Sequence, residues 1–327
     1  MIDYSVIIRT IGTANSTFDR LMDCIFLLNP KPAEIIVVLP LGVDIKKRTG
    51  VKYLHCEKGM IKQRLYGLNA CKTPYALFCD DDVVFPPDFV QKLHLPVEKG
   101  LCSFSSAPLL DFLPQKGIVE MLYMITGATS PTIFHRDKYV NILSTTGYSY
   151  NRNIKRFDYM YADSLPWTCF YAKTQDFKDV HLEDEIWIDK KNYASMDDQV
   201  MFYKAKLLGF KTMVVTNAEY QHLDARTSRN TNAVKVNVAY AMEFNRYVFW
   251  KRFIFDLDSG LKKKWDIMCI YYYFFWKKIY NFVRYILKRM NKEAYLAKKR
   301  ALYDAKKYVK SDEYKTIKSV FKFTDKE

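Results

Sequence analysis

The stretch YALFCDDD, residues 75–82, decides the fold, because an apolar strand ends there at three consecutive aspartates. Apolar runs at residues 5–8, 34–39 and 51–55 predict further strands, and runs with helical spacing lie near residues 18–28 and 61–70. This order predicts a doubly wound α/β domain whose first strands are parallel. Ligands of such sheets bind at the carboxyl ends of the strands, where the aspartates lie.

Charge divides the chain into two parts. The net charge is +15, but the residues from 245 onward hold 22 lysines and arginines against 9 acidic residues. We expect a nearly neutral catalytic domain over residues 1–230, with a nucleotide-sugar half (about 1–100) and an acceptor half (about 101–230). Residues 231–327 are expected to form a helical basic extension. A uniformly basic nucleic-acid coat is disfavoured by this division.

Three further features bear on location. The seven cysteines form no CxxC pair, which favours free thiols in a reducing compartment. The first residues have the pattern of a strand and not of a signal peptide. The longest apolar run, residues 267–276, is about half of the ~20 residues that a transmembrane helix needs. The sequence therefore predicts a cytoplasmic protein.

The aspartate triplet suits a metal. Along an extended segment Asp80 and Asp82 point to one side and Asp81 to the other, so the outer two can meet one cation. Mg²⁺ and Mn²⁺ prefer oxygen ligands and commonly bridge carboxylates to substrate phosphates. The alternative is a solvated loop or a helix N-terminus, where aspartate is also common. The position directly after a core strand favours the metal site.

Taken together, four segments resemble family 2 glycosyltransferases with the GT-A fold. These are residues 5–10, 34–38, 59–67 and 78–87, and the resemblance covers about residues 4–225. It implies a Rossmann-like mixed sheet that binds a nucleotide-sugar. It also implies that Asp80 and Asp82 hold Mn²⁺ or Mg²⁺ on the donor diphosphate. Thr10, Arg64 and Asp81 are then expected beside the nucleotide-sugar.

One segment departs from the family pattern. The family usually has an aspartate and a Gly-Ser turn after the second strand, where the base and ribose bind. Here residues 39–42 are LPLG, and the next carboxylate is Asp44. We expect UDP as the nucleotide.

A second acidic pair, Asp197 and Asp198, opens a helical run that ends at Gly209. Ser195 is a candidate N-cap, and acidic residues favour the first turn of a helix, which accounts for at least one of the two. An inverting sugar transfer also needs a carboxylate that accepts the proton of the acceptor hydroxyl. By resemblance to the family's acidic pair, Asp198 is the expected general base and Asp197 is expected near the acceptor.

Three other residues are candidates for the site. His222 follows a predicted strand, and many GT-A enzymes supply a histidine from such a late position as a metal ligand. Arg226 is expected to neutralise a diphosphate of the donor or acceptor. Trp167 either presents its ring to a sugar or packs in the core.

The basic extension has two interpretations. Apolar residues recur at helical spacing over residues 279–290, with lysines and arginines on the other positions. Such a helix either lies on an anionic membrane surface or packs on the catalytic domain. Membrane contact through residues 261–295, on the inner face of the cell membrane, would suit a polyprenyl-diphosphate-linked acceptor.

The sequence thus predicts an inverting glycosyltransferase that transfers a sugar to a glycan or lipid-linked acceptor in surface polysaccharide synthesis. One alternative is a metal-dependent nucleotidyltransferase, but residues 9–14, RTIGTA, are too poor in glycine and lysine for its phosphate loop. A basic nucleic-acid-binding protein is the other alternative. The nearly neutral first part of the chain counts against it, so no nucleic acid is expected as a partner.

Overall fold

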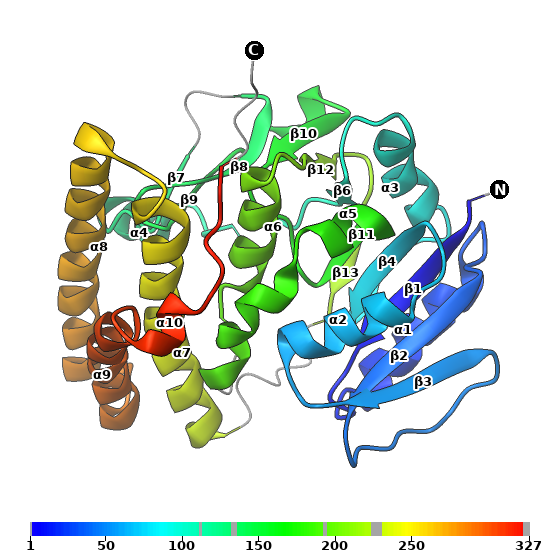
Figure 1. Ribbon diagram of the computed structural model, residues 1–327, viewed down its shortest axis with the longest axis horizontal. Coiled ribbons are helices and arrows are strands. Elements are labelled where there is room, and N and C mark those ends of the chain that lie inside the picture. The colour runs from blue at the N-terminus through cyan, green and yellow to red at the C-terminus, as the bar shows by residue number, and fades with distance from the viewer. Residues whose placement is uncertain (1, 111–112, 132–135, 192–194, 224–230, 323–327) are drawn as a thin grey trace.

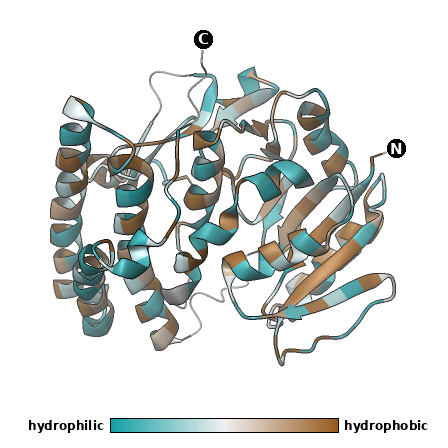
Figure 2. Cartoon of the chain, viewed as in Figure 1, coloured by the Kyte–Doolittle hydropathy of each residue, from teal (hydrophilic) through white to brown (hydrophobic). Residues whose placement is uncertain are grey.

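The computed structural model describes all residues except 1, 111–112, 132–135, 192–194, 224–230 and 323–327 (Figure 1). The first part is the predicted parallel arrangement, in which β1 lies between β2 and β4 and β3 pairs with β2. The strands are β1 (Tyr4–Arg9), β2 (Glu34–Pro40), β3 (Val51–Cys56) and β4 (Tyr75–Asp80). Their helices are α1 (Asn15–Leu27), α2 (Met60–Ala70) and α3 (Phe89–Glu98). Figure 2 shows β1 and β2 as largely hydrophobic, as expected for strands covered on both faces.

The second part extends this sheet with strands of mixed direction. Its strands are β6 (Phe104–Ser106), β7 (Thr129–Pro131), β8 (Lys138–Ile142), β9 (Tyr148–Tyr150), β10 (Tyr159–Ala162), β11 (Cys169–Lys173) and β12 (Thr212–Val215). Strand β11 runs antiparallel to β4 and thereby joins the two parts. In the described residues eleven strands form one sheet, in the order β3-β2-β1-β4-β11-β6-β12-β10-β8-β9-β7. The predicted α/β class with a mixed sheet is confirmed.

Shorter elements complete this second part. Two two-residue strands, β5 (Val83–Val84) and β13 (Gln221–His222), pair apart from the main sheet. The helices are α4 (Ile118–Ile125), α5 (Thr174–Asp179) and α6 (Asp197–Leu207), with 3₁₀ turns at η2 (Ile154–Arg156) and η3 (Leu182–Lys191). Residues 195–209 therefore form the predicted helix and its Gly209 terminus, but the N-cap is Met196 and not Ser195.

The C-terminal part is helical, as predicted. It consists of α7 (Asn232–Trp250), a π-helical turn (Lys251–Phe255), α8 (Gly260–Ile286), α9 (Lys292–Tyr308) and α10 (Asp312–Lys315). Its inner side chains, such as Phe244, Ile270 and Ala301, belong to the hydrophobic core on one face of the sheet. The domain boundary near residue 230 stays a prediction, since residues 224–230 lie outside the described part. No helix in the described residues has the length and hydrophobicity to cross a bilayer.

Helix α2 lies unusually close to the sheet at Gly67. A Cβ atom placed on Gly67 would lie 2.5 Å from Ile7 Cγ2 and 3.1 Å from Val38 Cγ2. Both neighbours are fully buried strand residues, so they have little room to move. The absence of a side chain at Gly67 thus sets the distance between α2 and the strands that carry the site.

We expect Gly67→Val to destabilise the fold by about 1–3 kcal/mol, because the new side chain would overpack the contact between α2 and β1. Denaturant unfolding measures this loss. The matched control is Asn69→Val, which places the same side chain at an exposed position of the same helix. Equal stability of the two variants would contradict the close approach.

Candidate functional site

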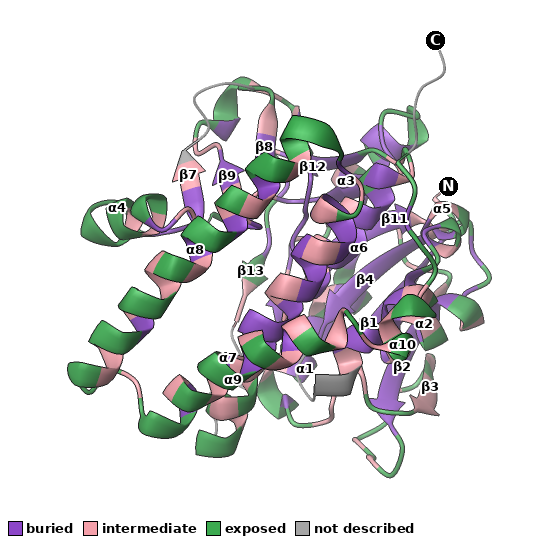
Figure 3. Cartoon of the chain, turned by 60° about the vertical axis from the view of Figure 1, so that its left-hand side comes forward, coloured by how far each residue is buried: buried purple, intermediate pink, exposed green. Residues whose placement is uncertain are grey.

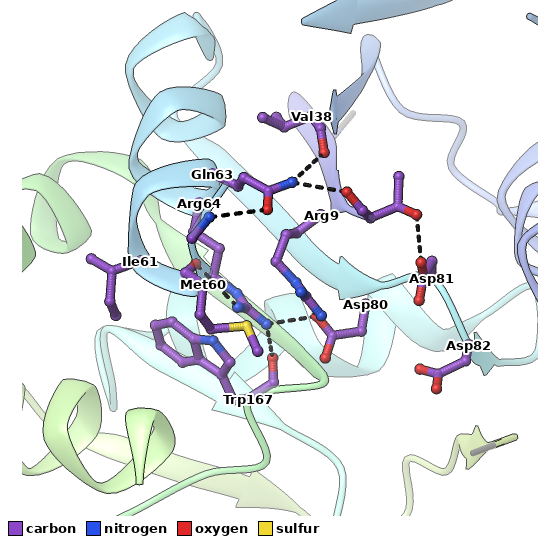
Figure 4. Close-up of polar contacts among 12 residues, drawn as sticks. Arg9, Val38, Met60, Ile61, Gln63, Arg64, Asp80, Asp81, Asp82 and Trp167 are labelled. Atoms are coloured by element: carbon purple, nitrogen blue, oxygen red, sulfur yellow. Dashed lines mark hydrogen bonds and ion pairs between the residues drawn. The ribbon is translucent and has the colours of Figure 1, made fainter. Parts of the chain in front are cut away.

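Two arginines converge on one carboxylate where β1 and β4 end. Arg9 and Asp80 are neighbours in the parallel register, and Arg9 Nε lies 3.2 Å from Asp80 Oδ1. Arg64 Nη2 reaches the same oxygen from α2 at 2.7 Å (Figure 4). Asp80 is buried, so both charges are held in a medium where ion pairs are strong. The two arginines fix Asp80 at the end of the central strand.

Arg64 is enclosed by protein. It is 1% exposed, its Nη2 also donates to the Trp167 carbonyl at 3.0 Å, and its guanidinium lies 4.3 Å from the Trp167 ring centre. Burial lowers the pKa of Arg64 to about 10, although Asp80 opposes the shift, so the side chain stays charged at neutral pH. These contacts make Arg64 a positioning residue for Asp80. Its predicted contact with the nucleotide stays a prediction.

The start of α2 is fixed by Asp189, which the sequence analysis did not single out. The Asp189 carboxylate accepts from the backbone amides of Met60 at 2.7 Å, Ile61 at 3.0 Å and Lys62 at 3.1 Å. These amides have no partner within the helix, so a carboxylate there stabilises it. A Cβ on Gly59 would lie 2.5 Å from Asp189 Oδ2, which explains the glycine before the helix. Asp189 thereby orients the helix that carries Arg64.

Asp81 points away from the two arginines and toward the loop after β1 (Figure 4). The Thr10 hydroxyl donates to Asp81 Oδ2 and accepts from the Gly12 amide at 2.9 Å. Gln63 Nε2 donates to the Thr10 carbonyl at 2.8 Å. Burial raises the pKa of Asp81 to about 6, whereas Arg9 and the Thr10 hydroxyl favour its charged form. Thr10 and Asp81 together order this loop, and their contact with a nucleotide-sugar stays a prediction.

Asp82 lies beside His222, and their role as metal ligands stays a prediction. Strands β5 and β13 pair so that His222 is opposite Val83, and the Leu223 amide donates to the Asp82 carbonyl at 2.7 Å. His222 Nε2 is then 3.3 Å from Asp82 Oδ1. A carboxylate suits Mn²⁺, and a neutral imidazole is a common metal ligand in proteins.

The side chains of Asp80, Asp82 and His222 fit a metal ion that also binds the substrate. Among the described residues no three His, Cys, Asp or Glu side chains gather into a metal cage. Both arginines contact Asp80 Oδ1, and Oδ2 has no hydrogen-bond partner in the described part of the chain. Mg²⁺ and Mn²⁺ in nucleotide enzymes are often held by one or two carboxylates plus substrate phosphates and water. Asp82 with His222, and Asp80 through Oδ2, meet that requirement.

Asp197 stands next to this cluster at the first residue of α6. The preceding Met196 is left-handed, with φ of 70°, and Asn245 Nδ2 donates to the Ser195 carbonyl at 2.8 Å. Burial and the adjacent Asp198 carboxylate raise the pKa of Asp197 to about 8, while Arg64 opposes the shift. Burial and the adjacent carboxylate thus favour the protonated form of Asp197, which counts against its serving as a general base.

Asp198 instead lines a cavity of about 130 Å³. The cavity walls include Tyr139, Tyr148 and the segment 164–166. Burial raises the pKa of Asp198 to about 6, although the Gln199 amide, 2.9 Å from Oδ1, favours the charged form. A carboxylate with this pKa is charged at neutral pH and is still basic enough to take a proton.

Two remaining predictions have different outcomes. Trp167 is 5% exposed and packs against Phe170 in the core with its ring centre 5.3 Å away, as in the packing alternative. Arg226 lies outside the described residues.

Sequence reasoning missed Asp189 because nothing in its 3₁₀ turn marks it as the partner of a helix 128 residues earlier in the chain. It missed Arg9 as well, although Arg9 directly follows a predicted strand.

Comparisons with known proteins bear on the family and on the fold. Residues 43–109 match the model of Glycosyl transferase family 2, a segment that includes Arg64 and all three aspartates. No curated protein matches the chain. The family match confirms the predicted resemblance to family 2.

Two solved structures share the fold. One is TarS of S. aureus, residues 1–349, in complex with UDP-GlcNAc, with a TM-score of 0.53, 15% identity, and coverage of 93% of this chain and 80% of that one. The other is GalNAc-T7 with UDP, GalNAc and Mn²⁺, with a TM-score of 0.51, 12% identity and coverage of 76% of this chain. This chain spans 50% of the GalNAc-T7 chain. The likenesses confirm the predicted GT-A fold.

Asp189→Ala should destabilise the protein by about 0.5–2 kcal/mol, because three amides at the start of α2 would lose their acceptor. Thermal unfolding measures the change. The same variant should bind nucleotide-sugars more weakly, since α2 carries Arg64. Asp3→Ala is the control, because Asp3 is exposed. A variant as stable as the control would show that Asp189 does not fix α2.

Proposed function

We propose that this glycosyltransferase, with its family 2 match and GT-A fold, transfers a sugar from a UDP-sugar to a hydroxyl of a glycan or lipid-linked acceptor with inversion. The supporting observation is that segment 164–167 borders both candidate sites. The Trp167 carbonyl bonds Arg64 beside Asp80, and Ser164, Leu165 and Pro166 line the cavity of Asp198. A donor diphosphate at Asp80 and Asp82 and an acceptor at Asp198 would thus meet at this segment.

In the proposed reaction Asp198 accepts the proton of the acceptor hydroxyl. The hydroxyl oxygen forms a bond to the anomeric carbon, and the bond from that carbon to the diphosphate breaks. Its electron pair leaves with the nucleoside diphosphate, so the sugar configuration inverts. Asp197, whose protonated form is favoured by burial, would donate a hydrogen bond and not accept the proton. The different surroundings of the two aspartates support this division, because Arg64 acts on Asp197 whereas Asp198 lines the cavity.

Asp82 and His222 would hold the divalent cation together with Asp80 Oδ2. Bound there, Mn²⁺ or Mg²⁺ would stabilise the negative charge of the departing diphosphate. The structure of GalNAc-T7 contains UDP and Mn²⁺, and the TarS structure contains UDP-GlcNAc, which supports UDP and a divalent cation here. Arg9 and Arg64 would keep Asp80 in place while the cation binds.

An exposed apolar surface supports peripheral membrane contact and a lipid-linked acceptor. Helix α4 has no buried residue, and α8 exposes large apolar side chains along its outer face (Figure 3). The Tyr272 hydroxyl donates to the Ile125 carbonyl at 2.5 Å and joins the two helices. On α8 the exposed large apolar side chains are Leu261, Trp265, Met268, Tyr271, Tyr272, Phe275, Ile279, Phe282, Val283 and Ile286. Basic residues at both ends of α8 would be attracted to anionic lipids.

We further propose a cytoplasmic protein on the inner face of the cell membrane that acts in surface polysaccharide synthesis. The apolar face of residues 279–290 is largely exposed, which supports the membrane alternative for that face. The inner face of α8, including Ile270 and Tyr273, is buried. The helix can therefore pack on the domain with one side and contact a membrane with the other.

Asp198→Asn should lower sugar transfer by about 10²–10⁴ while donor binding persists, because only the proton acceptor is lost. In the wild type the rate should fall as the pH drops below about 6, since protonation of Asp198 removes the base. Rates measured from pH 5 to 8 and donor titrations check both points. The assignment is wrong if Asp197→Asn is inactive and Asp198→Asn is active.

Asp82→Asn and His222→Gln should each abolish the thermal stabilisation that UDP gives in the presence of Mn²⁺. UDP at 100 times its Kd should stabilise a folded protein that binds it by about 2.7 kcal/mol. The loss of this stabilisation is readily measured. Asp158→Asn is the control, since Asp158 is exposed. Undiminished stabilisation in both site variants would refute this ligand set.

A further inference from the structure

A second pocket lies among α7, α8 and α9, and it is strongly basic. Its volume is about 240 Å³, enough for several water-sized groups, and it shares no lining residue with the cavity of Asp198. Four lysines line it against one glutamate, Glu243. They are Lys277, Lys278, Lys298 and Lys299.

Most of this positive charge is not neutralised by the protein. Lys298 pairs with Glu243 at 2.9 Å. In the described part of the chain Lys277, Lys278 and Lys299 have no carboxylate within ion-pair distance. Burial lowers the pKa of Lys277, and the like charges of Arg246 and Arg284 act in the same direction, although Glu243 opposes them. A bound anion would relieve this unfavourable burial of charge.

Asn281 gives an independent indication of a ligand. It lines the same pocket, is 7% exposed, and its Oδ1 has no hydrogen-bond partner in the part of the chain that the structure describes. Buried amides are nearly always hydrogen-bonded, so one without a protein partner needs an explanation. Oδ1 is an acceptor, so it can pair with the O–H of a protonated phosphate oxygen, while the amide nitrogen can donate to a charged oxygen of the same group.

We infer that this pocket binds a phosphate or diphosphate group, at a site separate from the nucleotide-sugar site. Several ammonium groups around a buried amide suit the multiple oxygens and charges of such a group. The pocket lies on the side of α8 that carries Phe274 and Asn281, whereas Phe275 and Phe282 are exposed on the outer face. A soluble phosphate compound, and not a lipid headgroup beneath the outer face, is therefore the expected source.

The test is calorimetric titration of the full-length protein with inorganic pyrophosphate in EDTA, which removes metal-dependent binding at the donor site. The double variant Lys277→Gln, Lys299→Gln should bind at least about tenfold more weakly, because each lysine contributes a charge-assisted hydrogen bond. Lys264→Gln, the control, removes an exposed lysine of the same helix and should bind like the wild type. Lys299→Gln alone, at an exposed position, should also weaken binding and serves if the double variant is unstable.

Unchanged pyrophosphate binding in the lysine variants, or no binding to the wild type, would overturn the inference. Sedimentation with phosphatidylglycerol vesicles identifies the source of the phosphate. A soluble source predicts equal sedimentation of wild type and double variant, and loss of sedimentation in the variant would identify a lipid headgroup as the ligand. Sugar-nucleotide hydrolysis should persist in the double variant, so a failure here and a failure of the proposed transferase activity are distinguishable.

Discussion

The ion pair between Arg64 Nη2 and Asp80 Oδ1, 2.7 Å apart, is the contact around which the site is arranged. Both groups are buried, and removal of one partner of such a pair typically costs about 3–5 kcal/mol because the other charge is left unpaired. Helix α2 can supply Arg64 only because Gly67 lets it approach the sheet and Asp189 fixes its first turn. The placement of α2, which depends on Gly67 and Asp189, thus sets the position of the Asp80 carboxylate.

The same constraint separates the roles of the other acidic residues. Arg9 and Arg64 keep the charge of Asp80 balanced, so that Asp81 and Asp82 can turn to different partners, Thr10 and His222. Consecutive carboxylates would otherwise repel one another. The positive charge of Arg64 also faces Asp197, whereas Asp198 lies at a separate cavity. Asp197 and Asp198 therefore have different surroundings although they are adjacent in the chain.

Local patterns in the sequence were enough for the first strands, for the acidic triplet and for the helix at residues 197–207, because each depends on neighbouring residues. The pairing of β5 with β13 could not be predicted, since each strand has only two residues and their partners lie far apart in the chain. His222 was nevertheless expected, from the family resemblance. Asp189 and the lysine pocket were missed, because both depend on how distant segments pack and leave no periodic signal.

We propose that a nucleotide-sugar binds at Asp80 and Asp82 through a divalent cation. The most direct measurement of this binding is UDP release from a panel of nucleotide-sugars, with Mn²⁺ and with EDTA. We expect at least one UDP-sugar to be hydrolysed slowly with Mn²⁺, and no UDP to be released in EDTA. Release that is the same in EDTA would contradict the metal site at Asp80 and Asp82. Absence of both hydrolysis and Mn²⁺-dependent thermal stabilisation with every nucleotide-sugar tested would contradict the donor site as a whole.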